Sequence, residues 1–303
     1  MRHEQAPGES PTVTDAHIAS PSTGPSRHAL RAGEILAGRY RVSRFIAGGG
    51  MGEVYEADDA LLRESVAVKL LRPELLRKPG AQDRFADEIK IARKITHRNV
   101  CRVFDVGTDG ERVFYTMELH SGGTLATLLQ RQGRLAAAAA APLVRQLLDG
   151  VAAAHAMDVV HQDLKPSNAL LAGADQTRLV LTDFGLAVPC CFELGCRCAM
   201  PHLLGTPFYM APEQVEGGMA LERTDVFALG VILYEMTTGA LPYRGASNDE
   251  IARARLSGDP PSPRALVPDL DAVWDDTIRA CLARDPAARP RNARAVAAAL
   301  GLA

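Results

Sequence analysis

The chain has 303 residues, of which 47% are hydrophobic and 23% charged, and its formal net charge at pH 7 is −2. These are ordinary values for a folded protein and argue against a fibrous, collagen-like or wholly disordered chain. Without an excess of positive charge there is no broad electrostatic field to hold nucleic acid or an anionic membrane, so we expect neither as a partner.

The first segment, residues 1–33, is rich in Pro, Ser, Thr, Gly and His and has scarcely any large apolar residue. Such a segment cannot offset its own ordering entropy by burial, so it is predicted to be a disordered tail. No apolar run or Gly follows Met1, which argues against a signal peptide and against myristoylation. The densest apolar stretch, residues 226–236, is too short to span a bilayer. Six unevenly placed cysteines are too few for a secreted disulfide framework, so we expect a cytoplasmic protein.

From Tyr40 the pattern changes to short β segments bounded by turns. Strand-like runs lie at residues 40–46, 54–55, 65–70, 100–106 and 113–119. Between the third and fourth runs, apolar residues recur at spacings of four, three and three, at Phe85, Ile89, Ala92 and Ile95. This spacing predicts a helix, so the first half of the chain is predicted to be a small β-rich unit with one main helix.

After Gly123 the chain becomes mostly helical. Six consecutive alanines at 136–141, followed by an apolar stripe, predict a long helix in which Pro142 is tolerable only near the first turns. Further helices are predicted over 226–237 and from Asp249, Ala272 and Asn292. No internal repeat is evident.

A glycine cluster at residues 47–54, AGGGMGEV, lies between two of the predicted strands. Glycines there let the backbone approach a ligand, and their N–H groups can face phosphate oxygens, although an ordinary hairpin turn has the same composition. Lys69 adds weight, because a lysine inside a buried strand is costly unless its ammonium meets an anion. Glu88, at the edge of the predicted helix, is a candidate partner. The alternative for this pair is a surface salt bridge.

A second group of polar residues lies in the segment HQDLKPSN at 161–168. It places a carboxylate, an ammonium and an amide within six residues, at Asp163, Lys165 and Asn168. Fifteen residues after Asn168, the triplet DFG at 183–185 supplies another carboxylate before a flexible glycine.

These motifs, together with GTPFYMAPE at 205–213, resemble those of the protein kinase family, specifically the bacterial Ser/Thr kinases of eukaryotic, or Hanks, type. The resemblance extends from about residue 38 to the last residue. It implies an α+β, two-lobed fold, with the tail over 1–33, a β-rich N-lobe over 34–119 and a larger, mostly helical C-lobe over 120–303. It also implies a Ser/Thr kinase that uses ATP and Mg²⁺ and acts on protein substrates.

The resemblance implies a role for each catalytic group. Lys69, oriented by Glu88, would hold the α and β phosphates of ATP. Asp163 would accept or orient the proton of the substrate hydroxyl, and Lys165 would stabilise the γ-phosphate. Phosphoryl transfer needs little covalent help, so positioning and charge neutralisation are the tasks these groups would perform.

Asn168 and Asp183 would supply the hard oxygen ligands that Mg²⁺ prefers. The nucleotide-binding positions that the resemblance implies are Ala47, Gly49, Gly52, Val54, Ala67, Lys69, Met117, Glu118, His120 and Leu170. Within this set, adenine would stack against Ala67 and Leu170, the backbone groups of Glu118 and His120 would bond it, and Met117 would close the inner pocket.

Two further sets of residues are architectural by resemblance. Glu213 is expected to form an ion pair with Arg289, and Asp225 is expected to anchor the backbone of the catalytic loop. Neither is expected to take part in the chemistry.

The sequence departs from the family pattern at two positions. Ala47 stands where the first glycine of the loop usually lies, and Gln162 replaces the arginine that usually precedes the catalytic aspartate. That arginine pairs with a phosphorylated activation loop, which glutamine cannot do with a full charge. Between Asp183 and Gly205 there is also no Ser, Thr or Tyr. We infer that the usual activation-loop phosphorylation switch is absent; a nucleotide-binding pseudokinase or scaffold is the alternative function.

Four of the six cysteines fall in the same stretch, at Cys190, Cys191, Cys196 and Cys198. Thiolates this close could bind a soft metal such as Zn²⁺ or form a disulfide on oxidation. The spacing is not a usual zinc pattern, and a solvated set of reduced thiols is the alternative. The hypothesis is that metal binding or oxidation here controls activity.

Overall fold

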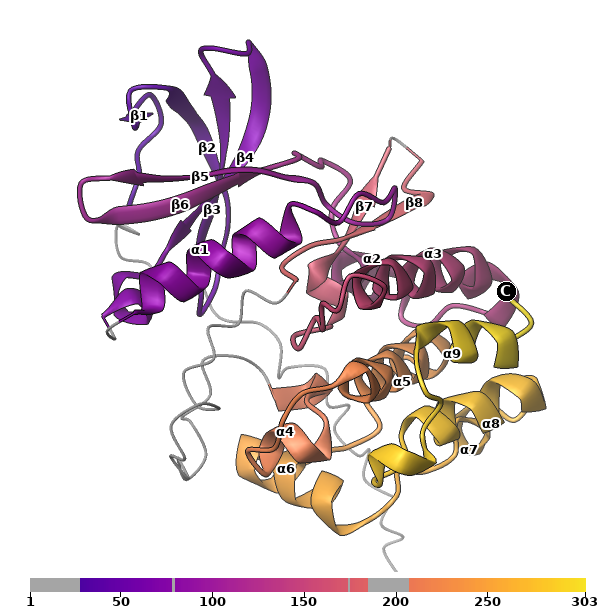
Figure 1. Cartoon of the computed structure of the whole chain (residues 1–303). Helices are drawn as coiled ribbons and strands as arrows, with labels where there is room; N and C mark the ends of the chain where they lie inside the picture. Colours follow the sequence, from indigo (N-terminus) through magenta and orange to yellow (C-terminus); the bar gives the residue numbers. More distant parts are fainter. Residues whose placement is uncertain (1–27, 78–79, 174, 185–206) are drawn as a thin grey trace, which may run out of the picture.

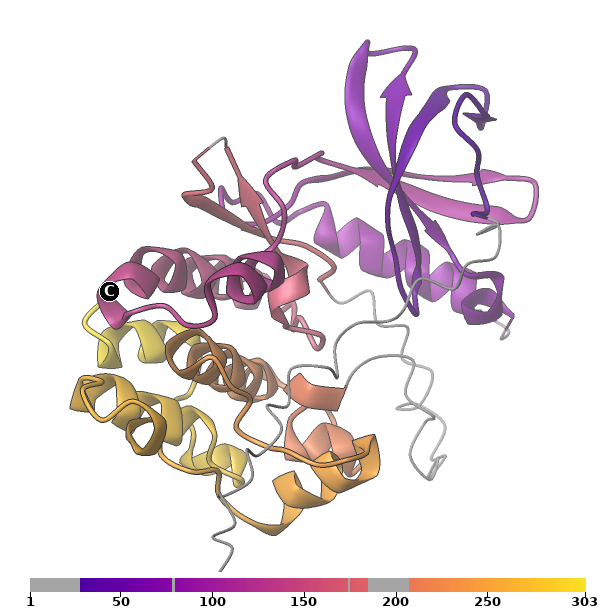
Figure 2. The same cartoon turned by 180° about the vertical axis from the view of Figure 1, so that it is seen from behind.

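The computed structural model describes residues 28–77, 80–173, 175–184 and 207–303. Figure 1 shows two parts: a twisted sheet with helix α1 against it, and a larger helical part with a small hairpin at their junction. We call them the sheet lobe and the helical lobe. The turned view in Figure 2 shows the same division. The predicted two-lobed α+β architecture is therefore confirmed.

The sheet lobe is one six-stranded antiparallel sheet in the order β1-β2-β3-β4-β6-β5. Its elements are β1 (Ile35–Leu36), β2 (Tyr40–Gly48), β3 (Gly52–Asp59), β4 (Glu64–Leu71), a 3₁₀ turn (Pro73–Leu76), α1 (Ala81–Ala92), β5 (Val103–Asp109) and β6 (Arg112–Met117). Helix α1 buries Phe85 and Ile89 in the same apolar cluster as Tyr115 of β6. The first part of the apolar stripe that predicted the helix is therefore the face that packs on the sheet, whereas Ile95 lies beyond the end of α1 and packs in the core of the helical lobe.

Strand β5 begins three residues later than the run predicted at 100–106. Val100 instead forms a parallel bridge with Leu181, and the Cys101 N–H donates to the Leu181 carbonyl at 2.7 Å. The apolar pattern is the same for either partner, so only the tertiary structure decides which strand these residues join.

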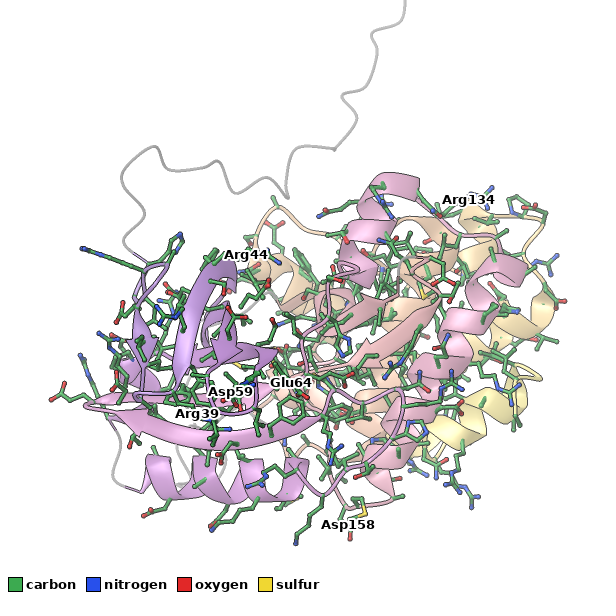
Figure 3. All side chains as sticks on the ribbon, turned by 90° about the horizontal axis from the view of Figure 1, so that it is seen from above. Arg39, Arg44, Asp59, Glu64, Arg134 and Asp158 are labelled. Carbon is green, nitrogen blue, oxygen red and sulfur yellow. The ribbon has the colours of Figure 1, made fainter. Side chains whose placement is uncertain are left out.

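The turn between β3 and β4 is held by a buried carboxylate. Asp59, 2% exposed, accepts two hydrogen bonds from Arg39, at 2.9 and 2.6 Å, and one from the Leu61 N–H at 2.9 Å. Both charged residues are labelled in Figure 3. The Arg39 guanidinium holds the pKa of Asp59 below its ordinary value, so this buried charge is fully compensated.

The helical lobe is built around one buried helix. Its elements are α2 (Leu125–Gln132), α3 (Ala137–His155), a 3₁₀ turn (Pro166–Asn168), β7 (Ala169–Ala172), β8 (Arg178–Leu181), a 3₁₀ turn (Pro207–Tyr209), α4 (Pro212–Val215), α5 (Glu222–Thr238), α6 (Asn248–Ser257), α7 (Pro263–Leu266), α8 (Ala272–Cys281), a 3₁₀ turn (Pro286–Ala288) and α9 (Ala293–Ala299). Helix α5 is buried almost throughout, which is why its sequence is apolar all round. Pro142 is the sixth residue of α3.

Five helices and strands of the helical lobe were not predicted from the sequence: α2, the one-turn helices α4 and α7, and the short strands β7 and β8. Helix α2 is capped by Thr124, whose hydroxyl accepts from the Thr127 N–H at 3.1 Å, and a Thr cap is a weaker sequence signal than a long apolar stripe. The strands have four residues each, too few for a clear period-two pattern. In the described part of the chain, no helix combines the length and apolar character that crossing a bilayer would require.

The two lobes are joined by hydrogen bonds as well as by the connecting chain. The chain passes from β6 to α2 through residues 118–124, where the expected boundary between residues 119 and 120 lies. Asn99 is 1% exposed, and its side-chain amide donates to the Leu179 carbonyl at 2.7 Å. The backbone carbonyl of Asn99 accepts from the Leu181 N–H at 2.9 Å. The β7–β8 hairpin is thereby fastened to the sheet lobe.

The chain just before β1 is packed rather than free. Leu30 is 3% exposed and belongs to the core cluster of the sheet lobe, and its N–H donates to the Tyr55 hydroxyl at 3.1 Å. The Ala29 N–H donates to the Glu53 carboxylate at 2.9 Å, and the His28 ring stacks on Phe45. The tail predicted for residues 1–33 is therefore wrong for residues 28–33, because a single well-placed leucine does not change a composition average. Residues 1–27 lie outside the described part.

This packing generates a first prediction. Replacing Leu30 with alanine leaves a cavity in the sheet-lobe core, so Leu30→Ala should lower the free energy of unfolding by about 2 kcal/mol in urea titrations. The matched control is Leu61→Ala, since Leu61 is 71% exposed and should change the free energy by less than about 0.5 kcal/mol. Equal effects of the two substitutions would contradict the burial of the segment.

Candidate active site

The glycine cluster forms the turn between β2 and β3, as predicted. Ala47 lies opposite Val54 in the register of the two strands, and the Gly49 N–H donates to the Gly52 carbonyl at 2.9 Å. Gly52 is required sterically, because a Cβ there would lie 2.0 Å from the Leu70 carbonyl oxygen. Ala47 and Gly49 are exposed at the tip, but both backbone groups of Gly49 are bonded within the protein, since its carbonyl accepts from Arg72 Nε at 3.0 Å.

Lys69 is the sixth of the eight residues of β4, opposite Val54 on one side and Tyr115 on the other. It is 4% exposed, and its ammonium is 2.7 Å from Oδ1 of Asp183. The buried ammonium of Lys69 therefore lies beside a carboxylate, as is expected of a lysine inside a buried strand. The side chain of Glu88, its expected partner, lies outside the described atoms, so that pairing stays a prediction.

Asp183 follows β8 with its backbone in the left-handed region, at φ +64°. Its Oδ1 accepts a second hydrogen bond, from the Tyr115 hydroxyl at 2.9 Å. Burial acts to raise the pKa of Asp183, but the Lys69 charge and these two hydrogen bonds lower it overall, so the carboxylate is held ionised. Tyr115 is not among the residues predicted from the sequence, because the signal for it is its strand register beside Lys69.

The catalytic-loop residues predicted from the sequence are brought together. Lys165 Nζ is 2.6 Å from Oδ2 of Asp163. The Asn168 amide nitrogen donates to the Asp163 carbonyl at 2.8 Å, across the 3₁₀ turn that ends at Asn168. A carboxylate, an ammonium and an amide thus face one another at one point of the helical lobe.

This loop is held through its backbone. Asp225, 1% exposed in α5, accepts from the N–H groups of His161 at 2.7 Å and Gln162 at 2.9 Å, and also contacts Nε2 of His155 at 2.8 Å. Gln214 of α4 donates from its amide to the Gln162 carbonyl at 2.9 Å. Gln162 has φ +67°, an uncommon conformation for a residue other than glycine, and these bonds on both sides hold it there. The anchoring contact expected of Asp225 is present.

The donor set fits a magnesium ion. The Asn168 carbonyl accepts from the Thr182 N–H at 2.9 Å, which extends the β7–β8 ladder by one pair and brings Asn168 next to the residue before Asp183. Asn168 uses its amide nitrogen on Asp163, which leaves the amide oxygen for a metal. The described residues contain no group of three or more His, Cys, Asp and Glu side chains that could form a protein-only metal cage. Two protein oxygens completed by phosphates and water are the usual Mg²⁺ arrangement.

The positions expected around adenine lie at the junction of the lobes. Ala67 and Met117 are register partners across β4 and β6 and both are buried, while Leu170 is half-buried in β7. The Glu118 N–H already donates to the Arg102 carbonyl at 2.9 Å, so only the Glu118 carbonyl can serve a ligand.

His120 follows in the same connection, with its ring enclosed and Nε2 3.6 Å from the Glu118 carboxylate. Burial lowers the pKa of His120 below its ordinary value, which favours the neutral ring at pH 7. Behind Met117 is a cavity of about 10 Å³, lined among others by Cys101 and Asp183. It is large enough for one water molecule at most.

Helix α4, which carries Gln214, is fastened by the expected ion pair. Arg289, with its side chain fully buried, donates two hydrogen bonds to Glu213 at 2.8 and 2.9 Å. Burial acts to raise the pKa of Glu213, but the Arg289 guanidinium lowers it overall. The four clustered cysteines and the residues from Gly185 to Thr206 lie outside the described part, so nothing in the structure bears on them.

Comparison with known proteins agrees with this geometry. The family described as Protein kinase domain matches residues 40–299. Serine/threonine-protein kinase PknL of Mycobacterium tuberculosis is 36% identical over 266 residues, which are 88% of this chain and 66% of PknL. PrkC of Bacillus subtilis is 32% identical over 257 residues, 84% of this chain and 39% of PrkC. The solved PknI kinase domain of M. tuberculosis superposes with a TM-score of 0.72 at 26% identity, covering 90% of this chain and 98% of that one.

The chain therefore belongs to the protein kinase family, and within it to the bacterial Ser/Thr kinases of Hanks type. The chain spans 66% of the length of PknL and 39% of the length of PrkC.

The Glu213–Arg289 pair gives a second prediction. Glu213→Gln leaves a buried guanidinium without its counter-charge and should lower the free energy of unfolding at pH 7 by about 3 kcal/mol. Because the pKa of Glu213 is lowered on folding, its contribution is present above the ordinary value of 4.5 and is lost as pH falls through the folded-state value. The difference between wild type and variant should therefore shrink below about pH 4.5.

The matched control is Glu216→Gln, because Glu216 forms an exposed and long ion pair with Arg284, at 3.9 Å, which should contribute little to stability. Urea unfolding at pH 7 and at lower pH measures both variants. A destabilisation by Glu213→Gln no larger than that of the control would contradict the prediction.

Proposed function

We propose that this chain is a protein Ser/Thr kinase that transfers the γ-phosphate of ATP to Ser or Thr hydroxyls of protein substrates, with Mg²⁺ as cofactor. The observation that supports it best is the convergence of four groups from three segments of the chain: Lys69, the loop residues Asp163 and Asn168, and Asp183. Phosphoryl transfer requires groups that position phosphates and neutralise their charge, and these groups supply both.

Each group has a task in this proposal. Lys69 holds the α and β phosphates, and Asn168 and Asp183 hold Mg²⁺, which when bound neutralises phosphate charge. Asp163 orients the substrate hydroxyl and accepts its proton. Lys165, paired with Asp163 in this structure, moves its ammonium toward the γ-phosphate when substrates bind.

The lobes supply the cleft. We propose that residues 34–119 and 120–303 act as the N-lobe and C-lobe, and that adenine binds between Ala67 and Leu170. Protein substrates are proposed from the names of the relatives, which are serine/threonine-protein kinases. The cytoplasmic location stays a prediction.

A third prediction tests the activity. Asp163→Asn removes the proton acceptor, so transfer from labelled ATP to a generic protein should fall by about 10² to 10⁴-fold, while nucleotide binding measured by calorimetry stays close to wild type. The control is Asp269→Asn at an exposed site, which should leave both unchanged. Wild-type protein that binds ATP but shows no transfer would instead support the pseudokinase or scaffold alternative, which Ala47 and Gln162 motivate.

We also propose that the enzyme works without the usual activation-loop phosphorylation switch, and that Cys190, Cys191, Cys196 and Cys198 control it by binding Zn²⁺ or by oxidation. The support comes from the sequence: no Ser, Thr or Tyr lies between Asp183 and Gly205, and four of six cysteines do. A cross-link there would constrain the segment that precedes α4.

A fourth prediction follows from this control. Wild-type activity should change on oxidation or on chelation of metal, and the variant with all four cysteines replaced by serine should lose that response. The control is Cys281→Ala, which keeps the cluster and alters a buried thiol elsewhere. If wild type and the serine variant each have the same activity in reductant, oxidant and chelator, the proposed regulation by these cysteines is wrong.

A further inference from the structure

The hydroxyl of Tyr115 is an unexpected polar group in an apolar environment. The residue is fully buried in β6 and lies in one cluster with Phe85, Ile89 and Val113. A phenylalanine would fill the same space without a hydroxyl to satisfy. A buried hydroxyl costs free energy unless it forms a hydrogen bond, so the acceptor of this hydrogen bond is important for the stability of the site.

That partner is the carboxylate expected to bind Mg²⁺. The hydroxyl donates to Oδ1 of Asp183 at 2.9 Å, and Lys69 Nζ lies 2.7 Å from the same oxygen. The tyrosine O–H is the donor in this bond, because an ionised carboxylate can only accept.

The two donors on Oδ1 of Asp183 fix the orientation of the carboxylate, and therefore the direction in which Oδ2 points. With Oδ1 bonded to Tyr115 and Lys69, rotation of the carboxylate is opposed, and no hydrogen bond among the described residues uses Oδ2, which is therefore available for the metal. Asp183 also has a left-handed backbone conformation that the surrounding structure must support, and Tyr115 bonds to this residue from the rigid sheet.

The register explains how one strand supplies this contact. Tyr115 pairs with Lys69, and Met117, two residues along on the same face of β6, pairs with Ala67. Tyr115, Met117 and Asp183 line the same small cavity at the junction of the lobes. Strand β6 therefore carries both an expected adenine-pocket residue and a bond to the metal-binding carboxylate.

We propose that Tyr115 is a positioning residue of the active site. Its hydroxyl orients the Asp183 carboxylate so that Oδ1 faces Lys69 and Oδ2 faces Mg²⁺. This inference rests on the proposed function, since it concerns the cofactor of the same site, and it adds a residue that no motif of the sequence indicates.

The test is Tyr115→Phe, which removes one oxygen atom and keeps the packing. The free Mg²⁺ concentration that gives half-maximal phosphoryl transfer should rise by about tenfold. Affinity for ADP without Mg²⁺ should be unchanged in calorimetry, and the gain in ADP affinity on adding Mg²⁺ should be smaller than in wild type. Tyr115→Met, which also lacks the hydroxyl, should shift the Mg²⁺ requirement in the same direction.

The matched control is Tyr40→Phe, a buried tyrosine of the same sheet that lies in a different apolar cluster from Tyr115 and contacts Phe114, and it should leave the Mg²⁺ requirement unchanged. A wild-type Mg²⁺ requirement in both Tyr115 variants would overturn the proposal. Equal loss of ADP affinity with and without Mg²⁺ would also overturn it, because it would indicate a packing role. Absence of transfer in wild type at every Mg²⁺ concentration would count against the proposed function instead, and the ADP titrations would still decide the role of Tyr115.

Discussion

The buried ion pair between Lys69 and Asp183 is the interaction on which the rest of the structure depends. An ammonium and a carboxylate removed from water are each costly alone, and they are stable here because they meet at 2.7 Å. One comes from the middle of the sheet and the other from the end of β8, so the pair can form only if the two lobes are docked. The bonds of Asn99 and Cys101 to the β7–β8 hairpin provide that docking.

The helical lobe has a different task, which is to hold a loop of uncommon backbone conformation. Asp225 comes from the most deeply buried helix and bonds two successive N–H groups, while Gln214 bonds the carbonyl of the same loop from α4. Arg289 fastens α4 through Glu213. The position of Asp163 is thus set by the rigid core of the lobe, which suits a group whose role is geometric.

These bonds also bear on the departure at Gln162. The structure holds this residue through its N–H and its carbonyl, with partners that do not depend on the side chain. The lack of the usual arginine therefore leaves the backbone support of Asp163 intact. This favours a working enzyme with altered regulation over a scaffold, and it is consistent with the lack of phosphorylatable residues after Asp183.

The sequence by itself determined which chemical groups are available and most of the longer elements. The HQDLKPSN and DFG segments, the buried position of Lys69 and the stripe of α1 are local patterns, and local patterns are encoded in neighbouring residues. Only the tertiary structure decided that Lys69 meets Asp183, that Tyr115 bonds the same oxygen, that Val100 joins β8 and that Leu30 packs on the sheet. Each of these contacts joins segments far apart in the chain, and its register depends on how whole elements pack, which no local pattern records.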